Sequence, residues 1–227
     1  HPRPVTRTRL RGWQGWLATL ACVLPFAVGF VLPVAVIGQY ALAYPQGWFG
    51  PGLAKALSHT LTLGGGAAVV TVLAAMFMVY GVRLSGLRLP RLMLPVTTIG
   101  YAAPGAVLAV GILFPLAALD HHLADLVLRV TGHDPGLVLT GTGFAIVVAY
   151  VVRFFALGQG ALDAAFTRVP PSLPMAARSL GRDAGGVLRD LYVPLMKGSV
   201  ASALLLVFVD CSKELPATLL LRPFNYE

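Results

Sequence analysis

The sequence predicts an all-α membrane protein, a polytopic bundle of transmembrane helices. Of its 227 residues, 57% are hydrophobic and only 11% are charged, whereas soluble domains carry roughly 25% charged residues. The apolar residues form five long runs, each near the roughly 20 residues that a membrane-spanning helix requires. Most Lys and Arg residues flank these runs instead of interrupting them. We therefore expect one transmembrane domain over residues 1–227.

Run length places five spans. They are Trp16–Leu42, Leu57–Val82, Leu92–Leu119, Thr140–Ala161 and Leu195–Cys211. The first run is too long for the apolar region of a signal peptide. The third carries Pro95, Pro104 and Pro115, so we expect it to be kinked or locally unwound. Broken helices often line the pathway of a transporter, although a kink satisfied by neighbouring helices is an equal alternative.

The distribution of Lys and Arg predicts the orientation. With the N-terminus in the cytoplasm, most basic residues fall inside, and the outside loops hold only Lys55 and Arg129 before Lys213. This asymmetry follows the positive-inside rule. The net charge of +8 therefore reflects membrane topology, and no basic face with interleaved aromatic residues indicates nucleic-acid binding.

A polar, basic segment separates the last two runs, at residues 170–194. Ser172 follows two prolines and is expected to be the N-cap of a short helix, and Gly181 is expected just past its end. A second helix is expected over Arg182–Val193, before Pro194. An amphipathic connector lying on the membrane surface is the structural alternative.

This segment resembles the cytoplasmic EAA loop of ABC importer permeases, whose pattern is Glu-Ala-Ala, three residues, Gly, nine residues, Ile-x-Leu-Pro. Met175 stands at the Glu position. The resemblance implies that the segment is a coupling loop that contacts a dimer of separate ATPase subunits. The residues expected to take part are Ser172, Met175, Ala176, Ala177, Gly181, Leu191, Val193 and Pro194.

Three further segments resemble permeases of the ferric iron importer group. They are Tyr101–Gly111, Tyr150–Phe154 and Lys213–Asn225. The resemblance implies a type I ABC importer permease of the bacterial inner membrane, supplied by a periplasmic binding protein. It also implies that this chain is the second half of a longer permease, without its last span, and that another half completes the pathway. Related branches move thiamine, phosphonates or polyamines.

Several residues in or near the membrane are candidates for the pathway or its gate. Arg153 lies in an apolar run, where a charge must snorkel or pair, and Asp210 and Lys213 are spaced to pair on one helix face. The full set is Pro104, Gly105, Arg153, Asp210, Lys213 and Glu214. The histidines and carboxylates of Asp120–Leu139 match no closed metal site, so we expect a solvated outside loop and no metal.

The sequence contains no phosphate-binding loop, so ATP hydrolysis is expected in a separate subunit and this chain is not expected to be an enzyme or to hold a cofactor. We expect the helix from Ser172 to Gly181 to act as a rigid lever that rocks the spans about the pathway. The alternative is an ion-coupled secondary transporter that uses Arg153 and Asp210. The register of the loop favours the importer.

Overall fold

The computed structural model describes residues 12–45, 51–86, 92 and 94–222. Within these ranges the regular structure is entirely helical. Five helical stretches are long and apolar enough to cross a membrane: Trp13–Ala43, Gly52–Ser85, Gly105–Thr131, Gly143–Thr167 and Ala184–Lys213. The predicted all-α polytopic fold is confirmed. The chain divides into two compact units, His1–Leu57 and Ser58–Glu227. Arg3, Arg7, Arg9, Arg11, Arg88 and Arg91, which the predicted orientation used, lie outside the described residues.

The described part of the first unit is dominated by one continuous helix. It consists of α1 (Trp13–Phe26), the π-helical segment η1 (Ala27–Val31) and α2 (Leu32–Ala43). None of its side chains is buried. A helix that is apolar on all sides has the composition of a membrane span, so the expected first span is confirmed with slightly wider bounds.

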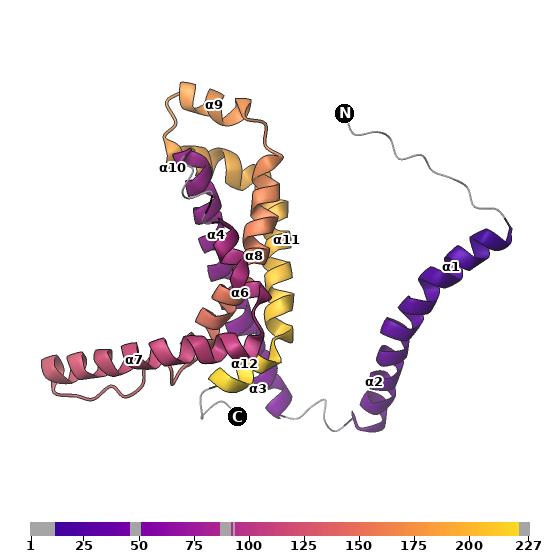
Figure 1. The fold of residues 1–227 in the computed structure, drawn as a ribbon, viewed down its shortest axis with the longest axis horizontal. Coiled ribbons are helices and arrows are strands. Elements are labelled where there is room, and N and C mark those ends of the chain that lie inside the picture. Colours follow the sequence, from indigo (N-terminus) through magenta and orange to yellow (C-terminus); the bar gives the residue numbers. More distant parts are fainter. Residues whose placement is uncertain (1–11, 46–50, 87–91, 93, 223–227) are drawn as a thin grey trace. The chain divides into compact units, whose positions relative to one another are not determined.

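The core of the second unit lies between three long helices, α4 (Gly65–Ser85), α8 (Gly143–Thr167) and α11 (Val193–Lys213), which run side by side (Figure 1). Fully buried alanines line their contacts, among them Ala67, Ala75, Ala149 and Ala203. Such small residues let helix backbones approach closely in a membrane. Helix α4 continues backwards through η3 (Thr60–Gly64) into α3 (Pro51–His59), so the second span starts earlier than expected.

The third expected span is broken into separate helices. A 3₁₀ turn, η4 (Leu94–Thr98), leads into the short α6 (Ile99–Ala102), and a new helix, α7 (Gly105–Thr131), starts after Pro104. Ala103 is extended, with φ −72° and ψ 140°, because the ring of a following proline disfavours the helical conformation of the residue before it. The expectation of a local unwinding in this run is confirmed at Ala103–Pro104.

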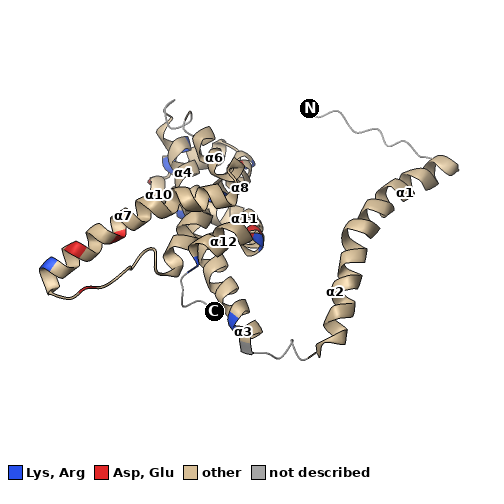
Figure 2. Cartoon of the chain, turned by 60° about the horizontal axis from the view of Figure 1, so that its bottom comes forward, with Lys and Arg blue, Asp and Glu red and all other residues tan. Residues whose placement is uncertain are grey.

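Helix α7 runs across the direction of α4, α8 and α11 (Figure 1) and extends well beyond the predicted Leu119. It ends at Gly132, which has a φ of 72°. The solvated loop predicted over Asp120–Leu139 is therefore wrong in its first half, where His121, His122 and Asp125 are helical. The charge of Asp120 does not end the helix, because loop N–H groups satisfy its carboxylate. Charged side chains are confined to the second half of α7 (Figure 2).

The fourth and fifth spans are longer than predicted. Helix α8 continues to Thr167, and the fifth span runs without interruption from Ala184 to Lys213 through α10 (Ala184–Val187), the π-helical η5 (Leu188–Tyr192) and α11. The separate helix expected over Arg182–Val193 is therefore wrong. Proline lacks an N–H and its ring clashes with the carbonyl four residues earlier, and the widened π turn just before Pro194 accommodates both effects. A short helix, α12 (Leu215–Leu221), follows.

Candidate coupling loop and helix-break ion pair

The loop between α8 and α10 carries one short helix, α9 (Ser172–Ser179), which is closed by Gly181. The N–H of Arg182 donates to the carbonyl of Ala177 at 3.1 Å, and the N–H of Gly181 donates to the carbonyl of Arg178 at 2.9 Å. These two bonds form a Schellman cap, which needs a left-handed residue. Gly181 supplies it with a φ of 83°, so the predicted end of the helix is confirmed.

The start of α9 differs from the prediction. Ser172 is the first helical residue, Pro171 occupies the N-cap position, and no side chain caps the first turn. The expected N-cap role of Ser172 is therefore wrong. Two prolines precede Ser172, and the N–H of Met175 donates to the carbonyl of Pro171 at 3.4 Å at the start of the helix.

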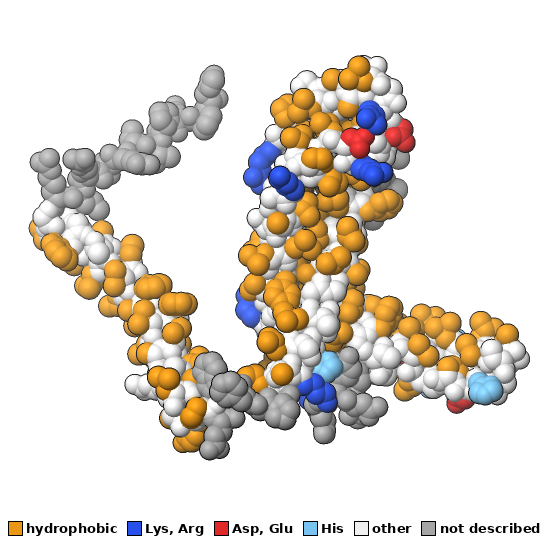
Figure 3. Space-filling model, turned by 180° about the vertical axis from the view of Figure 1, so that it is seen from behind, with side chains coloured by type: hydrophobic (Ala, Val, Ile, Leu, Met, Phe, Trp, Pro, Cys, Tyr) orange, Lys and Arg blue, Asp and Glu red, His pale blue; other side chains and the backbone are white. Residues whose placement is uncertain are grey.

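Helix α9 is almost entirely exposed and contains no buried residue. Ala176 is exposed and Ala177 is half-buried, while Met175 is 67% exposed and Leu180, just beyond the helix, is 85% exposed. Basic side chains, with a few acidic ones between them, lie at the end of the second unit that carries α9, and hydrophobic side chains cover its middle (Figure 3). The loop therefore presents a short helix whose exposed face carries the small side chains of Ala176 and Ala177 and the apolar side chains of Met175 and Leu180.

The base of the loop, in contrast, is firmly attached to the bundle. Tyr80, Phe166 and Tyr192 pack against one another, with ring centroids 4.8 to 6.0 Å apart. The hydroxyl of Tyr80 donates to the carbonyl of Ala184 at 2.6 Å. Asp183 caps α10 by accepting from the N–H of Gly186 at 2.8 Å. The loop thus returns to the bundle at a fixed point.

The structure separates the predicted coupling residues into two groups. The stretch from Ser172 to Gly181 forms the projecting helix and its cap. Leu191 lies in η5, and Val193 and Pro194 begin α11, so these three belong to the attached base. A hollow of about 230 Å³, lined by Met175 and Arg178 among others, lies between α9 and the ends of α4 and α8.

Sequence reasoning missed the contacts that join α4 to α8 beside the loop. Arg83 donates to Asp163 at 2.7 Å and to the hydroxyl of Thr167 at 2.8 Å, and its guanidinium lies over the ring of Phe166. Aromatic residues near the ends of spans, as in membrane-interface belts, were the signal that could have indicated the Tyr80–Phe166–Tyr192 cluster.

The second candidate site is an ion pair at the break between α6 and α7. Nε of Arg153 on α8 donates to Oε2 of Glu214 at 2.9 Å, and its Nη1 donates to the carbonyl of Ala103 at 2.5 Å. The side chains of Arg153 and Glu214 are 18% and 9% exposed. Arg153 is therefore paired inside the protein and does not need to snorkel. It also satisfies a carbonyl that the helix break leaves without its helical partner.

Glu214 lies close against the start of α7. Its Oε1 is buried and has no hydrogen-bond partner among the described residues, and it lies 2.1 Å from the position that a Cβ on Gly105 would occupy. Only glycine leaves room for the carboxylate there. A negative charge is favourable at a helix N-terminus, so α7 and Arg153 together compensate the charge of Glu214.

Polar contacts from α8 and α12 hold the backbone of Glu214. The hydroxyl of Thr218 donates to the carbonyl of Glu214, and the hydroxyl of Tyr150 donates to the Thr218 oxygen at 2.6 Å and lies 3.4 Å from the same carbonyl. This carbonyl is at the turn where α11 ends and α12 begins. The ion pair therefore links two helix breaks, one at Ala103–Pro104 and one at Glu214.

Asp210 and Lys213 pair with each other, as their spacing predicted. Nζ of Lys213 lies 2.8 Å from Oδ1 of Asp210, and the lysine is well exposed. Of the predicted pathway residues, the structure thus brings Pro104, Gly105, Arg153 and Glu214 into one cluster. The described ranges contain no group of three His, Cys, Asp or Glu side chains that could hold a metal ion.

Asp120 is the buried charge whose role the sequence did not reveal. Its two oxygens accept hydrogen bonds of 2.7 to 3.1 Å from the N–H groups of Val138, Leu139 and Thr140 and from the hydroxyl of Thr140. The expected solvated state is therefore wrong for this residue. The carboxylate holds the chain in position just before α8 begins.

These features define a multi-pass helical membrane protein with an exposed, glycine-capped helix between two of its spans. No protein-family profile matches the chain. The chain is, however, similar to curated transport permeases. The chain is 30% identical over 174 residues to the Fe(3+)-transport system permease protein FbpB 2 of Haemophilus influenzae, covering 74% of this chain and 30% of that protein.

Two further relatives agree. The identity is 27% over 173 residues to the ferric transport system permease protein FbpB of Actinobacillus pleuropneumoniae, covering 76% of this chain and 23% of the relative. The identity is 26% over 183 residues to the putative ferric transport system permease protein FbpB 1 of Haemophilus influenzae, covering 81% of this chain and 26% of that relative. The chain is a homologue of these permeases, which confirms the resemblance to ferric iron importer permeases predicted from the sequence, and it spans less than a third of their length.

Proposed function

We propose that this chain is part of the transmembrane permease of an ATP-driven importer for ferric iron. The names of its relatives support iron as the solute. On this proposal a periplasmic binding protein delivers the iron, a dimer of separate ATPase subunits supplies the energy, and another permease half completes the pathway. The location is the bacterial inner membrane, with the N-terminus and α9 in the cytoplasm, as the distribution of basic residues supports.

The projecting helix α9 is the observation that carries the proposal. A helix that transmits motion has to be accessible to its partner and fixed to the moving spans. Helix α9 is exposed, while the base of the loop, where the chain returns to the bundle, is attached through Tyr80, Phe166 and Tyr192. Ala176 and Ala177 allow close approach of an ATPase surface, and the exposed Leu180 offers it an apolar contact.

The cluster at the α6–α7 break is proposed to border the solute pathway. A broken helix exposes backbone polar groups that a transporter can use, and here Arg153 and Glu214 compensate each other beside it. When the ATPase dimer closes, α9 moves with its base. The spans then rock, and the pathway opens alternately to each side of the membrane.

Co-purification of the permease with its ATPase subunit tests the proposal. The variant Ala177→Glu places a charge on the proposed contact face, so the complex and ATP-driven iron uptake are both expected to fall at least about tenfold. Ala164→Glu, at an exposed alanine near the end of α8, is the matched control and is expected to retain both.

Two results would contradict the proposal. One is normal ATP-driven uptake by the Ala177→Glu variant, which would exclude α9 as the coupling element. The other is uptake that follows a proton or sodium gradient without any ATPase, which would favour an ion-coupled transporter and direct attention to Arg153 and Asp210.

A further inference from the structure

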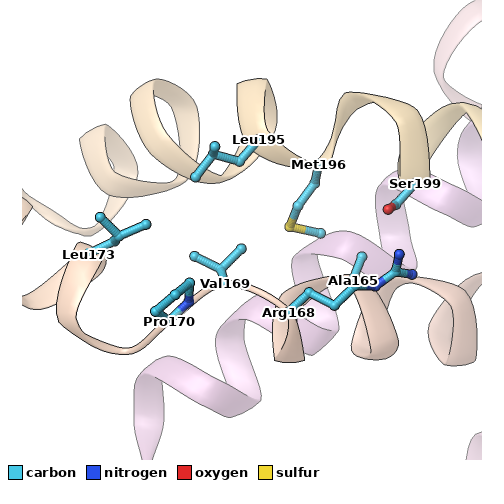
Figure 4. Close-up of a pocket in the computed structure, with 8 residues that line it drawn as sticks. All are labelled: Ala165, Arg168, Val169, Pro170, Leu173, Leu195, Met196 and Ser199. Carbon is cyan, nitrogen blue, oxygen red and sulfur yellow. The ribbon is translucent and has the colours of Figure 1, made fainter. Parts of the chain in front are cut away.

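The two ends of the second unit are built differently. At the end that carries α9, the chain leaves α8 through Arg168, Val169 and Pro170 and is separated from α11 by a pocket of about 220 Å³ (Figure 4). At the other end, α7 packs against α12 and α8 and then continues beyond them (Figure 1). Its second half, residues 116–131, projects from the bundle, and within this described stretch only Asp120 is buried.

Two contacts place α7 along the end of the bundle and not through it. Gly105, its first residue, lies against Glu214, which directly follows α11. Asp120 accepts from the N–H groups of residues 138–140, just before α8 begins. The start of α8 and the end of α11 share one end of the bundle, because the hydroxyl of Tyr150 lies 3.4 Å from the carbonyl of Glu214. Residues 105–120 therefore extend about 22 Å without leaving this end.

The projecting half of α7 has one apolar face and one polar face. The apolar side chains recur at intervals of three and four residues, which is the spacing of one side of a helix. They are Leu116, Leu119, Leu123, Leu126 and Val130. The opposite face carries His121, His122, Asp125 and Arg129. Figure 3 shows hydrophobic side chains along the edge of α7 that is turned towards the α9 end, and an acidic side chain and a histidine at its other edge.

The apolar face continues the face by which the first half of α7 packs on the core. Leu108, Ile112 and Leu116 lie four residues apart and pack against the buried core of the second unit. Beyond Leu116 the same face leaves the bundle, where Leu126 and Val130 are 58% and 76% exposed. A contiguous exposed apolar face indicates a protein or membrane contact. This one is turned to the side on which the apolar surfaces of the spans lie (Figure 3).

We propose that residues 116–131 lie in the plane of the membrane surface, with their apolar face in the lipid of the leaflet at this end of the bundle. A helix with separate apolar and polar faces satisfies both when its axis lies in the headgroup region. Asp125 and Arg129 carry opposite charges, so apolar burial and not attraction to anionic lipids holds the helix there. With α9 in the cytoplasm, as proposed above, this leaflet is the outer one. The inference depends on neither the solute nor the ATPase.

On this proposal α7 itself does not cross the membrane, although its length and composition would allow it. The third crossing is made by the chain that leads to Gly105 through η4 and α6. These segments pass along α8, where Thr97 donates to Gln159 and Arg153 donates to the carbonyl of Ala103. A helix held in the headgroup region fixes the depth of the break that follows Ala103.

Spin labels on the complete permease in lipid nanodiscs test the proposal, in a background with Cys22→Ser and Cys211→Ala. Relaxation by oxygen and by a water-soluble nickel complex gives the depth of each label. Labels on Leu119→Cys, Leu126→Cys and Val130→Cys are expected at one common depth, about 5–10 Å below the lipid phosphates. The label on Asp125→Cys is expected in water. Leu205→Cys, at an exposed leucine in the middle of α11, is the reference for the acyl chains.

Three results would overturn the proposal. Depths that change steadily from Leu119 to Val130, by about 16 Å in total, would show that α7 crosses the membrane. Labels on the apolar face that neither oxygen nor nickel reaches would show that a protein, such as another permease half, covers it. Labels reached by nickel on both faces would place the helix in water.

Charge substitutions supply a second test that needs no label. Leu126→Glu places a carboxylate on the lipid side, so the hydrogen-exchange rates of the α7 amides beyond Leu123 are expected to rise about tenfold. Ala118→Glu, at an exposed alanine on the polar face of the same helix, is the matched control and is expected to leave these rates unchanged. Equal rates in the two variants would also overturn the proposal.

Discussion

Arg153 and Glu214 form a largely buried ion pair of 2.9 Å that joins the middle of α8 to the turn between α11 and α12. Removing one partner of such a pair leaves an uncompensated charge, which destabilises a protein by about 3–5 kcal/mol. We expect Arg153→Met to lower the free energy of unfolding by about this amount. Glu214→Gln should lower it less, because the amide oxygen still accepts from Arg153. Thermal unfolding of the purified protein measures both effects.

A double variant supplies the control for this prediction. Arg153→Met combined with Glu214→Leu removes both charges, so it should be more stable than Arg153→Met alone. If Arg153→Met alone were as stable as the unchanged protein, the charge of Glu214 would not depend on Arg153 for its compensation, which would contradict the prediction.

Gly105 is predicted to accept no side chain. A Cβ there would lie 2.1 Å from Oε1 of Glu214 and 3.4 Å from Cζ of Arg153. Gly105→Ala should therefore displace Glu214 and destabilise the protein by about 1–3 kcal/mol. Gly111→Ala, on the same helix and with no atom within 4 Å of its Cβ position, is the matched control. Equal melting temperatures for the two variants would contradict the close approach.

Gly181 should be required for a stable end of α9. Its φ of 83° is strained for any residue with a Cβ, at a cost of about 1–2 kcal/mol. We expect Gly181→Ala to raise the hydrogen-exchange rates of the Gly181 and Arg182 amides, which donate in the Schellman cap, about tenfold. Gly198→Ala, which meets no atom within 4 Å, should leave these rates unchanged.

Asp120 is expected to hold the segment from Val138 to Thr140. Asp120→Ala removes the acceptor of three backbone N–H groups and one hydroxyl, so we expect a loss of at least about 2 kcal/mol in the free energy of unfolding. Faster proteolysis between Gly132 and Thr142 should accompany it. Asp125→Ala, at an exposed carboxylate on the same helix, is the control. If both variants are cleaved at the same rate, Asp120 does not hold this segment.

The fold could largely be predicted from the sequence because membrane spans are local features. Run length alone located all five long helices, and a proline was enough to indicate the break at Ala103. The errors have local causes as well. Asp120 marked the end of an apolar run but not of the helix, since its charge is satisfied by a loop eighteen to twenty residues away. Pro194 marked a boundary that the π turn removes.

The candidate site was predictable only where its geometry is local. Gly181 could be assigned because a helix end needs a left-handed residue, and the spacing of Asp210 and Lys213 was sufficient for their pair. The partner of Arg153 could not be predicted. Glu214 lies 61 residues further along the chain, and only the folding of α12 onto α8 brings the two together. The contacts of Tyr80 with Tyr192 and Ala184 depend on the same kind of distant packing.

The uninterrupted helix from Ala184 to Lys213 has a mechanical consequence. Its 30 residues amount to a rod of about 45 Å, with the base of the loop at one end and Glu214 directly beyond the other. A push along the axis at Ala184 reaches Glu214 unless the rod shortens on the way. The π turn at Leu188–Tyr192 is the one place in this rod where the helical winding already departs from the α form. Rewinding that turn into the α form would change the length of the rod and rotate one end relative to the other. The stiffness of the π turn therefore determines how closely a movement at one end is followed at the other.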